Sequence, residues 1–145
     1  MDFHANTLGS KERIKSRKQL ETLFAGGKSR SMVAYPVRLV YMTQDSDRLS
    51  PELMVMVSVS KRHFKHAVDR NRVKRQLREA YRLNKGVLAP TAERLGDKTL
   101  SMAFIWLADE LMPTERVSRS VVGLLERLNE KMTVIADIKK ETEGI

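Results

Sequence analysis

The sequence predicts a single domain of the α+β class. Three apolar segments, 32–42, 53–60 and 99–107, are rich in β-branched and aromatic residues, which favours strands. Two longer segments, 69–84 and one that begins near Thr114, repeat their apolar residues at a spacing of about 3.6, which predicts amphipathic helices. A chain of 145 residues is long enough for one core, and neither an internal repeat nor a linker divides it.

The N-terminal part is expected to contain a lead-in, a helix and an edge strand. Residues 1–12 form a lead-in that we expect to be flexible, and the domain itself is expected to span 13–138. A short helix begins near Ser16 and ends at a pair of glycines. Its apolar face is formed by Leu20, Leu23 and Phe24. The strand at 32–42 contains Pro36, which places it at a sheet edge or beside a bulge.

The remaining elements follow from charge and from helix-breaking residues. The strand at 53–60 has few charges on either face, so we expect it to lie centrally in the sheet. Gly86 and Pro90 are expected to end the helix at 69–84. Residues 139–145, after the C-terminal helix, are expected to fray.

The charge is strongly positive and unevenly distributed. The formal net charge is +9, which favours a polyanionic partner such as nucleic acid or an anionic membrane surface. Lys and Arg exceed Asp and Glu by 5 in residues 10–30 and by 8 in residues 60–85. Two segments therefore carry the excess charge.

Composition also restricts the compartment and the chemistry. The chain has no cysteine, which excludes disulfides and Cys-ligated zinc and is compatible with a reducing cytoplasm. The longest apolar stretch, 102–108, is far shorter than the roughly 20 residues that span a bilayer, and residues 1–13 lack the apolar region of a signal peptide. We therefore expect a soluble cytoplasmic protein.

The segment "AVDRNRVKRQLREAYR", residues 67–82, carries many arginines and only two acidic residues. On a helical wheel, an apolar stripe that should dock on the sheet is formed by Val73, Leu77, Ala80 and Tyr81. A different face, about 60° wide, contains four residues that we call the basic ridge: Asn71, Arg75, Arg78 and Arg82. The cations are thus sorted onto one face.

A solvated helix face is the ordinary explanation of a charge run. Such faces usually alternate opposite charges at i and i+4, whereas the basic ridge is nearly all of one sign, which destabilises an isolated helix. Phosphates compensate this repulsion, and arginine binds them in a bidentate manner. Asn71 both donates and accepts, which suits a base edge or a 2′-hydroxyl. The pattern therefore favours nucleic-acid binding.

Two aromatic residues are candidates for stacking on bases. Phe24 and Tyr35 would each contribute about 1–3 kcal/mol where a base stacks on them. Core packing is the alternative for both, and it is at least as good an explanation for Phe24 because of its helical spacing with Leu20 and Leu23.

The strings "RNRVKRQLRE", residues 70–79, and "VSVSKR", residues 57–62, together resemble the signature of the protein subunit of bacterial ribonuclease P. The resemblance covers most of the chain. It implies an α-β sandwich with a four-stranded sheet, in α-β-β-β-α-β-α order, with a left-handed β-α-β crossover like that of domain 2 of ribosomal protein S5. The fourth strand would come from dividing 28–42 or from the turn after it.

The resemblance also implies a function. Members of the family partner a catalytic RNA that removes the 5′ leader from precursor tRNA, with Mg²⁺ bound mainly by the RNA and with neither membrane nor DNA as a partner. The resemblance assigns Phe24 to the leader, and Tyr35 is added as a leader-binding candidate because it is aromatic. The residues that the resemblance assigns to RNA are Lys61, Arg62, Arg70, Asn71, Arg72, Lys74, Arg75 and Arg78. The pattern of positive charge adds Lys65 and Arg82 to the predicted RNA-binding residues.

The chain departs from the family pattern at three places. Leu20 stands where some members have a second aromatic residue. The segment "HFKHAV", residues 63–68, lacks the glycine that many members have between the basic strand end and the basic helix. Asp109 and Glu110 follow the last strand where relatives often carry Lys or Arg, so RNA contacts there are not expected.

Other functions fit the sequence less well. His63 and His66 lack a third metal ligand, and Ser60 beside Lys61 suits phosphate contact better than nucleophilic catalysis. No protein catalytic residue is identified, and the missing carboxylate cluster disfavours a self-sufficient nuclease. A helix-turn-helix DNA reader is disfavoured because the basic helix follows a strand. The main alternative is a general RNA- or ribosome-binding module without a cleavage partner.

Overall fold

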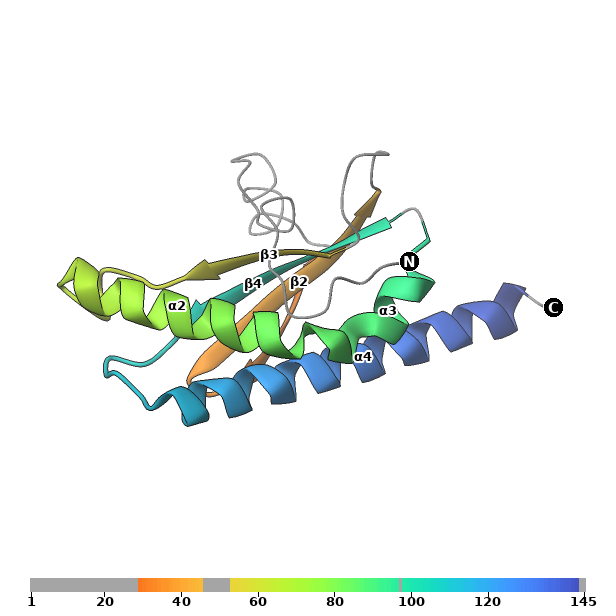
Figure 1. The fold of residues 1–145 in the computed structure, drawn as a ribbon. Coiled ribbons are helices and arrows are strands. Elements are labelled where there is room, and N and C mark those ends of the chain that lie inside the picture. The colour runs from red at the N-terminus through yellow and green to blue at the C-terminus, as the bar shows by residue number, and fades with distance from the viewer. Residues whose placement is uncertain (1–28, 46–52, 97, 144–145) are drawn as a thin grey trace.

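The computed structural model describes residues 29–45, 53–96 and 98–143, which form a four-stranded sheet with helices packed against it (Figure 1). The strands are β1 (Arg30–Ala34), β2 (Val37–Asp45), β3 (Leu53–Ser58) and β4 (Lys98–Trp106). The helices are α2 (Ala67–Asn84), the 3-10 helix η2 (Lys85–Leu88), α3 (Ala89–Arg94) and α4 (Thr114–Glu143). The predicted lead-in and first helix, with Phe24, lie outside the described residues.

The sheet is mixed, with the strand order β1-β2-β4-β3. β1 pairs with β2 and β2 with β4 in antiparallel fashion, whereas β3 and β4 are parallel and are connected through α2, η2 and α3. The prediction that the strand at 53–60 is central was wrong, because β3 is an outer strand of this sheet. Leu53, Met54 and Val55 are nevertheless buried, so an outer strand covered on both faces carries as few charges as a central one.

The predicted strand at 32–42 is two strands joined at a tight turn. Tyr35 and Pro36, linked by a cis peptide bond, separate β1 from β2, and Ala34 pairs with Val37 across the turn. Proline cannot donate a ladder hydrogen bond, which explains why strand pairing is interrupted at this point. The division supplies the fourth strand, and β1 is an outer strand.

α2 and α4 lie side by side and cover the sheet (Figure 1). The apolar stripe predicted for α2 is buried, with Val73, Leu77 and Tyr81 each 0% exposed, and α2 packs against α4 and β3. The ring of Tyr81 lies against that of Phe104 in β4, with ring centroids 5.9 Å apart. α4 contributes Val117, Val121, Leu124, Leu125 and Leu128 to the same core. Each such buried side chain stabilises the fold by roughly 1.5–3 kcal/mol.

The helix boundaries differ slightly from those predicted. α2 begins at Ala67, two residues before the predicted start, and ends at Asn84. Pro90 stands in the first turn of α3, where a missing N–H costs nothing, so it begins a further helix. α4 begins at Thr114 as predicted and extends to Glu143, beyond residue 138, where the domain was predicted to end.

Candidate nucleic-acid interface

The ten residues predicted to bind RNA lie on two adjoining segments, α2 and the connector between β3 and α2, residues 59–66. The structure therefore brings them to one region of the molecule. Half-buried side chains are those of Arg70, Lys74 and Arg82. Exposed side chains are those of Lys61, Arg62, Lys65, Asn71, Arg72, Arg75 and Arg78.

The basic ridge occupies an exposed face of α2, while the apolar stripe of the same helix is buried. Asn71, Arg75 and Arg78 are exposed and follow one another at spacings of four and three residues. Cations at these spacings repel one another, and an adjacent phosphate chain would relieve this repulsion. The sorting of cations that the sequence predicted is therefore present in the fold.

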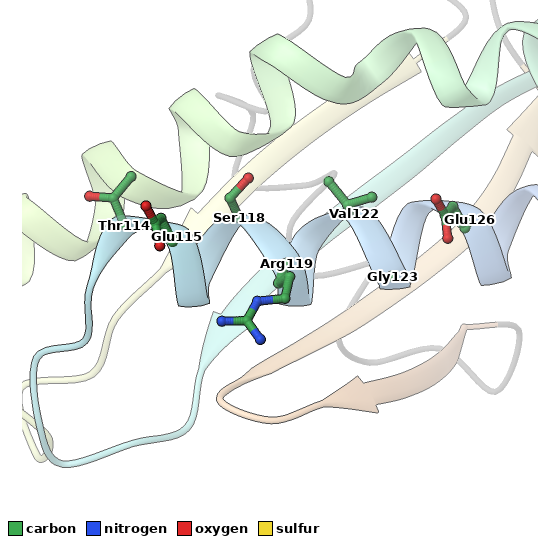
Figure 2. A pocket seen from close by; sticks show the side chains of 7 residues that line it. All are labelled: Thr114, Glu115, Ser118, Arg119, Val122, Gly123 and Glu126. Atoms are coloured by element: carbon green, nitrogen blue, oxygen red, sulfur yellow. The ribbon is translucent and has the colours of Figure 1, made fainter.

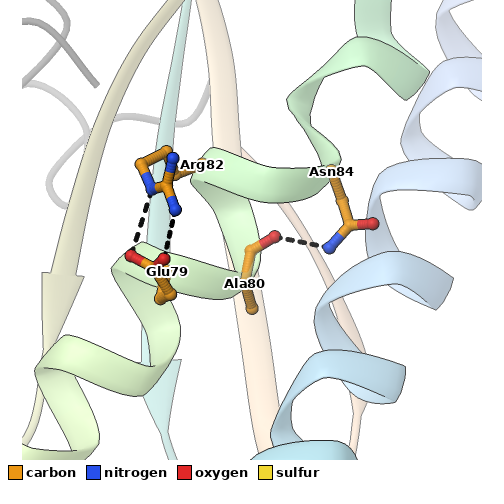
Figure 3. A network of polar contacts seen from close by, with 4 residues as sticks. All are labelled: Glu79, Ala80, Arg82 and Asn84. Carbon is orange, nitrogen blue, oxygen red and sulfur yellow. Dashed lines mark hydrogen bonds and ion pairs between the residues drawn. The ribbon is translucent and has the colours of Figure 1, made fainter. Parts of the chain in front are cut away.

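The C-terminal end of the ridge already has an acidic partner (Figure 3). Arg82 donates from Nε to Glu79 Oε2 at 3.1 Å and forms a second contact through Nη2 to Oε1. This hydrogen bond from Arg82 lowers the pKa of Glu79, and the same contact raises the pKa of Arg82. This pair was not predicted, although the spacing of three residues between an acid and an arginine on a helix was the signal that could have found it.

Arg70 supports the connector from within. Its Nη1 donates to the carbonyl oxygens of Phe64 at 2.8 Å and Lys65 at 3.0 Å. The side chain thus ties the first turn of α2 to the chain that precedes it. Arg70 was predicted to bind RNA, and its contact with the connector was not predicted.

The connector has a defined path. The Ser60 carbonyl accepts from the His63 N–H at 3.1 Å, and the Ser60 hydroxyl accepts from the Arg62 N–H at 3.1 Å. Phe64 is buried in the main core. Ser60 therefore shapes the turn that presents Lys61 and Arg62 to solvent.

His63 contacts Asp109, in the loop between β4 and α4, and the two residues belong to two of the places where the chain departs from the family pattern. The distance from His63 Nδ1 to Asp109 Oδ1 is 2.6 Å. Neither residue was predicted to have this partner. Among the residues that the structure describes, no group of three or more His, Cys, Asp or Glu side chains is arranged to hold a metal ion.

Tyr35 lies at the same end of the sheet as the connector but beside the opposite outer strand. It sits in the β1–β2 turn with 54% of its surface exposed. Its carbonyl accepts from Arg116 at 3.0 Å and from Ser120 at 3.1 Å, both on α4, and Arg127 of α4 donates to the Val33 carbonyl at 2.9 Å. The turn is held by α4 while the ring of Tyr35 faces solvent, which leaves it accessible to a base.

A cavity of about 620 Å³ lies elsewhere, along α4 (Figure 2). It is lined by Thr114, Glu115, Ser118, Arg119, Val122, Gly123 and Glu126. All seven residues come from one helix, their charges are mixed, and none was predicted to contact RNA. We therefore place the candidate interface at the connector and α2. No helix in the described ranges is long and apolar enough to cross a membrane.

Comparisons with known proteins identify the family and the fold of the chain. The family model described as Ribonuclease P matches residues 8–129. The chain is 39% identical over 121 residues to the ribonuclease P protein component of Porphyromonas gingivalis, and the match covers 83% of this chain and 85% of that protein.

Two solved structures share the fold. The RNase P protein of Thermotoga maritima has a TM-score of 0.60 at 21% identity, covering 80% of this chain and 96% of that one. A mutant of the Staphylococcus aureus RNase P protein has a TM-score of 0.60 at 20% identity, and the match covers 81% of this chain and 87% of that one.

Proposed function

Because the chain belongs to the ribonuclease P protein family, we propose that it binds the catalytic RNA of that enzyme together with the 5′ leader of precursor tRNA. Family membership makes it a subunit of an endoribonuclease that acts in tRNA 5′ processing and has an RNA partner. In this proposal the protein assists the endonucleolytic step that gives the mature tRNA 5′ end. The proposal extends to a cytoplasmic location, where precursor tRNA is available.

The observation that carries the proposal is the set of exposed cationic side chains on the connector and α2. Seven of its ten predicted residues are exposed, and the buried stripe of α2 fixes the helix so that the basic ridge faces outward. Such a surface reduces repulsion between phosphates and fixes the orientation of the RNA, without reading sequence. This is the contribution expected of an accessory protein bound to a structured RNA.

Catalysis belongs to the RNA in this proposal. Mg²⁺ bound mainly by the RNA would supply the activated water and the stabilisation of the leaving group. The described side chains of the interface are cations and hydrogen-bond donors, which suit phosphate oxygens and do not suit a metal ion. The protein would therefore act by holding the RNA and the leader in place.

Reconstitution tests the proposal most directly. The purified protein is added to a bacterial ribonuclease P RNA and 5′-extended precursor tRNA at low Mg²⁺, and leader removal is followed over time. We expect the protein to increase the rate, because cations on the protein replace part of the Mg²⁺ that offsets phosphate repulsion. RNA binding without any increase would instead favour a general RNA- or ribosome-binding module.

The contribution of the basic ridge is measured by salt dependence. The logarithm of the binding constant falls with the logarithm of salt by about 0.7 per phosphate contact on single strands. Arg75→Ala should reduce this slope by about one contact or less. Arg119→Ala is the matched control, because it removes the same charge from an exposed position on α4. Equal slopes for Arg75→Ala and the unmodified protein would argue against the ridge.

Leader binding is tested by the two aromatic candidates. Phe24→Ala and Tyr35→Ala should each weaken binding to precursor tRNA with a 5′ extension more than binding to mature tRNA, by about 1–3 kcal/mol where a base stacks. Equal losses on the two RNAs would indicate a packing role.

A further inference from the structure

The connector meets the loop between β4 and α4, residues 107–113, because of the sheet topology. β3 and β4 are parallel neighbours, and Ser58 pairs with Ile105 near their C-terminal ends. Segments that leave two adjacent parallel strands emerge side by side. The connector, which follows β3, and this loop, which follows β4, are therefore neighbours although they lie far apart in the sequence.

A side-chain pair joins the two segments at His63. Its side chain is 10% exposed, whereas that of Asp109 is 83% exposed. An ionised carboxylate only accepts hydrogen bonds, so His63 Nδ1–H donates to Asp109 Oδ1, at 2.6 Å. Hydrogen bonds to charged groups are shorter and stronger than those between neutral groups.

The loop that carries Asp109 is itself held on both sides of that residue. The Leu107 N–H donates to the Pro36 carbonyl at 2.8 Å. On the other side, Gln76 of α2 donates from Nε2 to the Met112 carbonyl at 3.1 Å and to the Thr114 hydroxyl at 3.2 Å. Asp109 is therefore presented by a fixed backbone, which makes it a suitable anchor for the connector.

The pair acts on the connector at the residue that directly follows Lys61 and Arg62. C-terminal to this point, the connector is held by buried Phe64 and by Arg70, which binds the carbonyls of residues 64 and 65. The His63 side chain adds a restraint between that anchored part and the exposed cations. A cation on an ordered backbone loses less conformational freedom when it binds phosphate than one on a mobile backbone does.

We propose that His63 and Asp109 are a positioning pair that holds the connector in its RNA-binding shape, so that Lys61, Arg62 and Lys65 meet phosphates together. This inference rests on the proposed RNA-binding function. In this chain, an acidic residue after the last strand thus assists RNA binding indirectly, through the histidine that it orients.

Charge alone predicts the opposite effect. Asp109 is a carboxylate close to a cationic surface, so simple Coulomb repulsion of phosphates means that removing it should tighten RNA binding. Positioning means that removing it should weaken RNA binding. The sign of the change in affinity therefore distinguishes the two explanations.

The test measures binding of fluorescently labelled, 5′-extended precursor tRNA to four single variants and one double variant. Each protein is measured well below its own unfolding temperature. Asp109→Ala should weaken binding about three- to tenfold, as expected for two coupled residues near the surface. Asp109→Asn should retain most of the affinity, because the amide oxygen still accepts from His63. Glu110→Gln, the matched control, should bind as tightly as the unmodified protein or more tightly. His63→Ala should weaken binding in the unmodified protein and have little further effect in Asp109→Ala.

The inference is overturned if Asp109→Ala and Asp109→Asn both bind as tightly as the unmodified protein or more tightly, or if the effects of His63→Ala and Asp109→Ala simply add. Should Asp109→Ala not fold, His63→Phe replaces it, because phenylalanine keeps an aromatic ring at this position and removes the donor to Asp109. Binding by His63→Phe as tight as that of the unmodified protein would then overturn the inference. Arg75→Ala in the same assay separates the two proposals. A weakened Arg75→Ala with normal Asp109 variants overturns the positioning pair alone, whereas normal binding by all variants overturns the RNA-binding surface itself.

Discussion

Arg70, Arg75 and Arg82 are one residue type on one helix, yet each has different surroundings. Arg70 binds two carbonyl oxygens of the connector, Arg75 is exposed, and Arg82 is paired with Glu79. Under the proposed function, these three arginines would therefore not contribute to RNA binding in the same way. Substitution of each should have a different consequence for binding and for folding.

Glu79 is expected to limit the affinity of the basic ridge. Glu79→Gln removes a negative charge beside the ridge and weakens the contact that holds Arg82, so RNA binding should become about two- to fivefold tighter at roughly 0.1 M salt. The salt slope should steepen by up to one contact, about 0.7. Titrations at several salt concentrations measure both quantities.

Glu93→Gln is the control for this prediction, because it makes the same change at an exposed position on α3. Equal increases in RNA affinity for Glu79→Gln and Glu93→Gln would mean that net charge alone, and not the contact between Glu79 and Arg82, determines the affinity.

At the scale of the elements, α2 has two faces with separate roles. Leu77 belongs to the buried stripe and is 0% exposed, whereas Leu83 on the same helix is 51% exposed. Leu77→Ala should lower the free energy of unfolding by about 2–5 kcal/mol, because it removes buried contacts and leaves a cavity. Leu83→Ala should change it by about 0.5 kcal/mol or less. Urea denaturation of the two variants measures the difference, and similar losses would show that the stripe does not anchor α2.

The sequence predicted α2 well and the sheet less well, for a physical reason. Periodic apolar residues report which face of a helix is buried, and Val73, Leu77 and Tyr81 are buried as expected. Apolar content in a strand reports whether its faces are covered, but not how many strands lie beside it. The prediction that β3 is a central strand was therefore wrong, while the prediction that this segment forms a strand was confirmed.

The contact between His63 and Asp109 was not predictable from local patterns. The two residues are 46 positions apart, and they meet because β3 and β4 are parallel neighbours. The resemblance drew attention to both segments as departures from the family, but only the sheet topology brings them together. In contrast, the pair of Arg82 with Glu79 follows from helical spacing alone.

For the whole molecule, the buried hydroxyl of Tyr41 makes the free energy of unfolding decrease at alkaline pH. Burial raises the pKa of Tyr41, and the nearby Arg30 partly opposes this rise. The unfolded chain loses the proton near the ordinary pKa of about 10, while the folded protein still keeps it. The contribution of the Tyr41 hydroxyl to the free energy of unfolding is therefore fully present below about pH 10. It is lost as the pH rises through the pKa of Tyr41 in the folded protein.

Tyr41→Phe should remove this dependence. Among the described residues, the Tyr41 hydroxyl has no hydrogen-bond partner, so the substitution should leave stability at pH 7 unchanged or raise it by about 1 kcal/mol. The stability difference in favour of the variant should widen as the pH rises from about 9 to 11. Urea denaturation at each pH tests this, and parallel curves for the two proteins would contradict it.

Arg116 and Arg127 of α4, which contact β1 and the turn after it, affect the tendency of the protein to self-associate. Outer strands offer free backbone groups to which other chains add as further strands, a common route to aggregation. Here the carbonyls of Val33 and Tyr35 are occupied by Arg127, Arg116 and Ser120. The two arginines therefore place positive charge at this end of the strand, which repels a second copy of a basic protein, and they occupy two carbonyls that intermolecular pairing could otherwise use.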